Sequence, residues 1–127
     1  MAHSATPLIP RKLLFGNPDR ANVSISPDGS MLAYLAPLAG VLNVWVAPVD
    51  QPNDARPITR DKGRGIRYAA WTHLPGRLIY IQDKDGDENW RIYRVDVETE
   101  EAVCLTPQEG VRAYVAVMNP DRPSEIV

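Results

Sequence analysis

Residues 83–88 form the stretch of the chain best suited to bind a metal ion, since they hold three aspartates and a glutamate. Ca²⁺ takes six to eight oxygen ligands, and a helix–loop–helix calcium loop needs glycine at its sixth position and glutamate at its twelfth. Counted from Asp83, the glycine falls at the fourth position and Arg94 at the twelfth, so the pattern fails. We therefore expect a hairpin loop without a metal, in which Gly86 has a positive φ and the polar side chains accept hydrogen bonds from turn amides.

Serine and histidine side chains are the next candidates for chemistry, because together they could form a hydrolytic site. An α/β-hydrolase carries its nucleophile in a G-x-S-x-G turn, followed by an acid and a histidine. No serine of this chain lies between glycines at that spacing, and the histidines are His3 and His73. We therefore assign no catalytic residue, no cofactor-binding residue and no metal ligand, and expect no cofactor.

The overall composition limits the kinds of partner that the chain can have. It has 127 residues, a formal net charge of −2 and a sequence pI of about 5.6. This balance argues against nucleic acid or an anionic membrane as the main partner. The basic run 60–67 is interpreted as a solvated connector. With no secretory h-region and no apolar run long enough to span a membrane, the sequence predicts a cytoplasmic location.

The chain repeats itself after a shift of 46 residues, because identical residues recur at that spacing along its length. Three pairs mark the repeat most clearly, and we interpret them as structural positions rather than ligands. They are Gly40 with Gly86, Asn43 with Asn89, and Asp50 with Asp96.

Each repeat contains four short apolar runs, which are separated by turn signals such as SPDGS and LPG. The runs predict strands at 22–26, 31–36, 43–49 and 56–59, then at 68–72, 77–82, 89–97 and 102–105. A repeat of this length with four strands is typical of a β-propeller blade. Residues 43–49 are apolar on both faces, as expected of a sheet between two others.

The sequence therefore predicts an all-β fold, a partial β-propeller with two four-stranded antiparallel blades plus the start of a third. The expected parts are a lead-in segment at 1–20, blade 1 at 21–66, blade 2 at 67–112 and a truncated start of blade 3 at 113–127. Because propellers close with about four to eight blades, we expect the chain to be a fragment. The alternative is a short protein that covers its sheets by self-association.

Four segments carry a resemblance to a known family: IPRKLLFGNPDR, VSISPDGSMLAYLAP, NVWVAPVD and IYIQDKDGDENWRIYRVDVETEE. In this order they resemble the N-terminal β-propeller of prolyl-oligopeptidase-family serine peptidases, in the acylaminoacyl-peptidase and dipeptidyl-aminopeptidase-like branch. The resemblance covers residues 9–127 and departs from the family at ETEE, which replaces a turn with glycine. It implies a non-catalytic propeller that controls peptide access to a C-terminal α/β-hydrolase domain absent from this chain. That domain, and peptide substrates through the parent protein, would be its partners.

Two further expectations concern partners. A TolB-like propeller that serves as a protein-interaction module, with no attached enzyme, is the alternative function, and the sequence that follows Val127 distinguishes the two. The hairpin PLAGVLN, residues 37–43, is apolar where its counterpart in the second repeat is charged. Exposed apolar clusters mark interfaces, so we expect Leu38, Val41 and Leu42 to contact a neighbouring domain or another chain.

Overall fold

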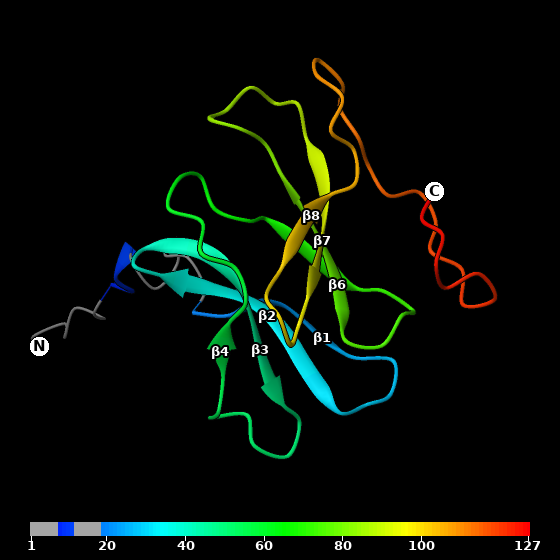
Figure 1. Cartoon of the computed structure of the whole chain (residues 1–127). Helices are drawn as coiled ribbons and strands as arrows, with labels where there is room; N and C mark the ends of the chain where they lie inside the picture. Colours follow the sequence, from blue (N-terminus) through cyan, green and yellow to red (C-terminus); the bar gives the residue numbers. More distant parts are fainter. Residues whose placement is uncertain (1–7, 12–18) are drawn as a thin grey trace, which may run out of the picture.

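The structure is a computed structural model, and it describes residues 8–11 and 19–127. Residues 1–7 and 12–18, which make up most of the predicted lead-in segment 1–20, lie outside the described part. The described residues form eight β-strands in two four-stranded antiparallel sheets (Figure 1). The all-β class and the two predicted blades are therefore confirmed.

Each sheet pairs its strands in the order in which they follow along the chain. Blade 1 contains β1 (Ala21–Ile25), β2 (Met31–Leu38), β3 (Val41–Pro48) and β4 (Arg56–Pro57). Blade 2 contains β5 (Tyr68–Trp71), β6 (Arg77–Gln82), β7 (Arg91–Asp96) and β8 (Ala102–Cys104). Such a four-stranded meander is the unit from which propellers are built.

The first two strands of the blades follow the predicted spacing of 46 residues. Ile25 pairs with Leu32 in blade 1, and Trp71 pairs with Leu78 in blade 2. The short β1–β2 turn of blade 1 places Gly29 at a φ of 75°, a conformation in which glycine avoids steric cost. The turn signals SPDG and LPG thus fix the same register in both blades.

The connections between the second and third strands differ in length. Blade 1 uses the two-residue turn Ala39–Gly40, in which both residues have positive φ, as a tight hairpin requires. Blade 2 uses residues 83–90, which separate the paired residues Gln82 and Arg91. Gly86 has a φ of 85° in this loop, which confirms its predicted role.

This difference shifts the repeat within the third strand. The amide of Val44 donates to Thr59 Oγ1, and the amide of Ile92 donates to Thr106 Oγ1, each at 2.9 Å. Val44 is therefore the counterpart of Ile92, a spacing of 48 residues rather than 46.

The structure consequently corrects two of the three residue pairs that were expected to mark the repeat. Asn43 corresponds to Arg91 and not to Asn89, because each precedes the strand residue that the threonine hydroxyl holds. Asp96 pairs with Arg77 across its hairpin, whereas Asp50 is exposed and lies beyond β3. Only the pair Gly40 and Gly86 keeps the same conformation in both blades, with a φ of 85° in each.

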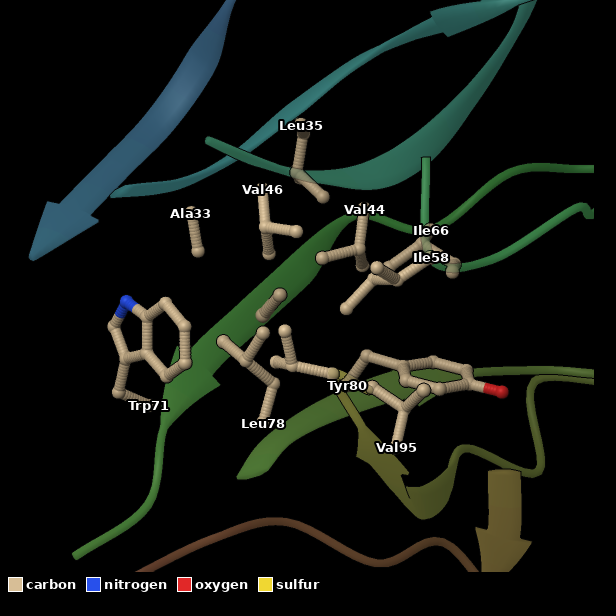
Figure 2. Packing of buried hydrophobic residues seen from close by; sticks show 12 residues of the cluster. Ala33, Leu35, Val44, Val46, Ile58, Ile66, Trp71, Leu78, Tyr80 and Val95 are labelled. Atoms are coloured by element: carbon tan, nitrogen blue, oxygen red, sulfur yellow. The ribbon is translucent and has the colours of Figure 1, made fainter. Parts of the chain in front are cut away.

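The hydrophobic core lies between the two sheets, with side chains of β2 and β3 facing those of β5, β6 and β7 (Figure 2). Val44, Val46, Leu78 and Val95 are completely buried there. Trp71 closes one end of this core, and its Nε1 donates across the blades to the carbonyl of Ser24 at 3.4 Å. Burial of each such side chain contributes about 1.5–3 kcal/mol, so the blades stabilise each other.

The C-terminal segment continues beside blade 2 (Figure 1). The amide of Ala113 donates to the carbonyl of Trp90 at 2.8 Å, and Val117 and Val127 exchange two backbone hydrogen bonds of 2.9 and 3.0 Å. Two segments are thus paired as the first strands of another sheet would be. The assignment of residues 113–127 to a third blade stays a prediction.

Candidate functional site

A cleft of about 600 Å³ opens between the turns at one end of the two blades. It gathers side chains of the types that hydrolases use, and its polar lining includes Ser26, Asp28, Ser30, His73, Arg77 and Asp96. These residues come from the β1–β2 turn of blade 1, the β5–β6 turn of blade 2 and the end of β7.

The hydrogen bonds in this cleft are not those of a hydrolytic triad. The hydroxyls of Ser26 and Ser30 both donate to Asp28 Oδ1, at 2.6 and 2.8 Å. No hydrogen bond joins His73 to either serine among these described residues. An activated serine needs a base that accepts its proton, and that base must be oriented by a third group. The cleft therefore has the composition of a hydrolytic site without its geometry.

Asp28 is instead the centre of a turn. In addition to the two hydroxyls, its carboxylate accepts the amide of Ser30 at 3.0 Å. The bond from the Ser26 hydroxyl, then those from Ser30, lower the pKa of Asp28 from 3.8 to about 2. Donors that bind the ionised form favour it, so this carboxylate stays charged and holds the turn.

Asp96 has the corresponding role in blade 2. Its Oδ1 accepts the amides of Glu98 and Thr99 at 3.0 and 3.1 Å, and its Oδ2 lies 3.6 Å from Arg77 Nη2. The bond from Thr99 is the main cause of the lowered pKa of Asp96. The second predicted marker of this kind, Asp50, has no matching geometry, because it is exposed after the end of β3.

The acidic loop 83–90 has the hairpin chemistry that the sequence predicts. Asp87 Oδ1 accepts the amides of Lys84 and Asn89 at 3.1 and 3.0 Å, and the side-chain amide of Asn89 reaches Asp87 Oδ2 at 3.2 Å. Within residues 8–11 and 19–127, no three His, Cys, Asp or Glu side chains gather in a group that could hold a metal ion.

Asp83, at the start of this loop, differs from the solvated side chain that the sequence suggests. Its side chain is only 1% exposed, and its nearest cation is Arg64, whose Nε lies 3.6 Å from Oδ1. Neither carboxylate oxygen receives a hydrogen bond from the residues that the structure describes. The sequence gives no local signal for this burial, because the residue that covers Asp83 belongs to the connector between the blades.

The basic run 60–67 is also less solvated than a free connector would be. Arg60 Nη1 lies 2.5 Å from Glu100 Oε2, and Arg56 Nη1 lies 2.7 Å from Glu100 Oε1. The hydrogen bond from Arg60, with the charges of both arginines, lowers the pKa of Glu100. The connector is therefore tied to blade 2 by ion pairs at both Glu100 and Asp83.

The apolar hairpin tip of blade 1 is partly accounted for by this connector. Leu38, Val41 and Leu42 are all half-buried, and Leu38 pairs with Val41 across the turn. The carbonyl of Leu42 accepts the amide of Ile66 at 2.8 Å, so its inner side contacts the connector. Contact of the tip with another domain or chain stays a prediction.

The described residues include no helix of the length and apolarity that crossing a bilayer requires. No family model matches the chain.

Two curated relatives cover nearly the whole chain. Dipeptidyl aminopeptidase BIII of Pseudoxanthomonas mexicana is 48% identical over 124 residues, which are 98% of this chain and 18% of that protein. Dipeptidyl peptidase family member 6 of Caenorhabditis elegans is 35% identical over 123 residues, which are 91% of this chain and 16% of that protein. The chain thus spans less than a fifth of the length of these relatives.

Solved structures agree on the fold. The β-propeller domain of the trilobed protease from Pyrococcus furiosus is 25% identical, with a TM-score of 0.54 over 67% of this chain and 27% of that chain. A TolB-type protein of Agrobacterium tumefaciens has a TM-score of 0.57 at 16% identity, over 68% of this chain and 32% of that one. Acylaminoacyl peptidase of Pyrococcus horikoshii has a TM-score of 0.52 at 22% identity, over 67% of this chain and 17% of that one.

The fold, the order of the strands and the identity along the chain agree with one another. The chain is therefore homologous to dipeptidyl aminopeptidases, and its fold is that of the β-propeller domains of peptidases.

Proposed function

We propose that this chain is a non-catalytic propeller portion of a cytoplasmic serine peptidase, and that it controls which peptides reach a C-terminal α/β-hydrolase domain. The observation that carries the proposal is the 48% identity to a dipeptidyl aminopeptidase across 98% of this chain. The cleft with Ser26, Asp28 and His73 supports the non-catalytic part, since its serines donate to a carboxylate and not to histidine.

Control of access requires blades that do not separate easily. The core between the blades supports this, because Val44 and Val46 of one sheet and Leu78 and Val95 of the other are fully buried against each other. Protein interiors of this kind are packed like organic crystals and leave few voids larger than a water molecule. A peptide would therefore have to enter the propeller elsewhere than between these two blades.

The proposal also assigns a partner to the hairpin tip at residues 38–42. Leu38 and Val41 are half-buried without a role in the core between the blades. An apolar tip of this kind suits contact with a neighbouring domain, and in a peptidase that domain would be the hydrolase.

The length of the substrate provides the test. In the protein expressed from the full reading frame, we expect rapid release of dipeptides from short peptides and little cleavage of folded proteins. Trp71→Ala removes the side chain that closes the core between the blades, so it should raise the rate on long substrates relative to short ones. A wild-type protein that degrades long and short substrates at equal rates would contradict the gating role.

The competing function is that of an interaction module without an enzyme, as for a TolB-like propeller. The likeness to the Agrobacterium protein, at 16% identity, shows the fold alone. The reading frame after Val127 separates the two. A G-x-S-x-G motif followed by an acid and a histidine supports the peptidase, whereas a stop codon after further blades supports the module.

A further inference from the structure

We propose that Arg64 is a reversible strap, which closes the connector between the blades over the β6–β7 loop and covers the carboxylate of Asp83. The inference rests on the geometry of the connector and the loop, and it does not depend on the proposed peptidase function.

The connector places Arg64 firmly because the residues on both sides of it are fixed to blade 1. Gly65 has a φ of 80°, and a Cβ built on it would lie 3.0 Å from the amide nitrogen of Leu42. The amide of Gly65 donates to Asp61 Oδ2 at 2.7 Å, and the amide of Ile66 donates to the carbonyl of Leu42 at 2.8 Å. Only glycine allows the backbone to approach Leu42 so closely, and this approach aims Arg64 at blade 2.

The β6–β7 loop offers a matching surface for the guanidinium. A Cβ built on Gly86 would overlap Arg64 Nη1, so the planar group lies directly on the glycine backbone. From this position Arg64 Nε is 3.6 Å from Asp83 Oδ1, at the start of the same loop. One side chain from the connector therefore contacts both ends of the turn that contains Gly86.

The contact is built to open. The side chain of Arg64 is 43% exposed, whereas that of Asp83 is 1% exposed, so the arginine can move into solvent while the acid cannot. The distance of 3.6 Å exceeds that of a hydrogen bond, and Asp83 has no donor in the described residues that would replace the arginine. Opening would uncover a carboxylate with both oxygens free to accept donors from water or from a cationic group. A partly exposed ion pair is also weakened by salt, which makes the strap sensitive to ionic strength.

Glycine substitutions test the strap, because the chain contains a matched control. Gly40 and Gly86 have the same φ of 85°, but a Cβ on Gly40 would meet no atom within 4 Å. Alanine at either position therefore strains the backbone equally, and only Gly86→Ala displaces Arg64. We expect Gly86→Ala to lower the folding equilibrium constant, measured by urea unfolding, about tenfold more than Gly40→Ala. In an Arg64→Ala background the two glycine substitutions should cost the same. Equal costs with Arg64 present, or a gap that persists without it, would overturn the proposal.

Amide hydrogen exchange provides a second measurement that needs no strained variant. Arg64→Gln changes only a partly exposed side chain, and it should speed exchange at the loop amides of Lys84, Asp87 and Asn89 by about fivefold or more. Addition of about 0.5 M NaCl should have a similar effect on the wild-type loop and none on Arg64→Gln, because salt screens the ion pair. Unchanged exchange in Arg64→Gln, or equal salt effects in both proteins, would show that Arg64 does not hold the loop.

Discussion

Thr59 and Asn43 form a hydrogen bond that is buried in blade 1, with Thr59 Oγ1 donating to Asn43 Oδ1 at 2.9 Å. The same oxygen of Asn43 accepts the amide of Asp61 at 2.7 Å, and its side-chain amide donates to the carbonyl of Asp61 at 3.0 Å. Thr59 Oγ1 in turn accepts the amide of Val44. This network joins β3 to the start of the connector, so it positions the segment that carries Arg64.

Asn43→Ala should therefore destabilise the chain strongly. Asn43 is 0% exposed, and its removal leaves a buried hydroxyl and a buried amide without their partners, at a cost of about 3 kcal/mol. Asn89→Ala is the control, because Asn89 is half-buried and its side chain bonds only to the exposed Asp87. We expect it to cost less than about 1 kcal/mol in urea unfolding. Similar costs for both substitutions would mean that the two asparagines are equivalent after all.

Trp71→Ala should weaken the packing between the blades. Trp71 is 8% exposed within the core and donates to the carbonyl of Ser24 in the other blade, so its truncation should cost about 3–5 kcal/mol. Tyr68→Ala, on the same strand but 41% exposed, should cost about 1 kcal/mol or less. Urea unfolding of both variants measures the difference, and a cost for Trp71→Ala as small as that for Tyr68→Ala would place the tryptophan outside the core.

Glu100 should be easier to replace by glycine than by alanine. Its φ of 59° is a left-handed conformation that a residue with Cβ adopts at a cost of about 1–2 kcal/mol. Both substitutions lose the ion pairs with Arg56 and Arg60, but only glycine relieves the backbone. The Gly variant should therefore be more stable than the Ala variant by about 1 kcal/mol in thermal or urea unfolding. The opposite order would show that the strain at Glu100 is negligible.

The pH dependence of the β1–β2 turn follows from Asp28. Its pKa in the folded chain is about 2, below the ordinary value of 3.8, because the hydroxyl of Ser26 and the groups of Ser30 bind the ionised form. The stabilisation from Asp28 is therefore fully present above pH 3.8 and is lost as the pH falls through about 2. An NMR titration of the Asp28 carboxyl should have its midpoint near 2, and Ser26→Ala should raise it. A midpoint at 3.8 would contradict the turn geometry.

The sequence predicts the strands well because each is a short apolar run between strong turn signals. The first two strands keep the 46-residue spacing, since SPDG and LPG connect them with equal length. The third strand escapes this prediction because identical residues, Asn43 and Asn89, coincide at that spacing by chance. A better signal was present in the threonines that follow β4 and β8, Thr59 and Thr106, whose hydroxyls hold Val44 and Ile92 in the same way.

The links between the blades are less predictable, because they join residues that have no local relation in the sequence. Arg64 lies in a basic connector and Asp83 in an acidic loop, and both segments read as solvated when considered alone. Their contact depends on Gly65, whose close approach to Leu42 cannot be derived from composition. The ion pairs of Glu100 with Arg56 and Arg60 have the same origin.

Peptidase activity tests the central proposal most directly. Release of the chromophore from a dipeptidyl arylamide should be measured side by side for this 127-residue chain and for the protein from the full reading frame, each with and without a serine-directed inhibitor. The proposal predicts no turnover by the chain alone and inhibitor-sensitive turnover by the full-length protein. Turnover by the chain alone that the inhibitor abolishes, or a full-length protein without activity, would contradict it.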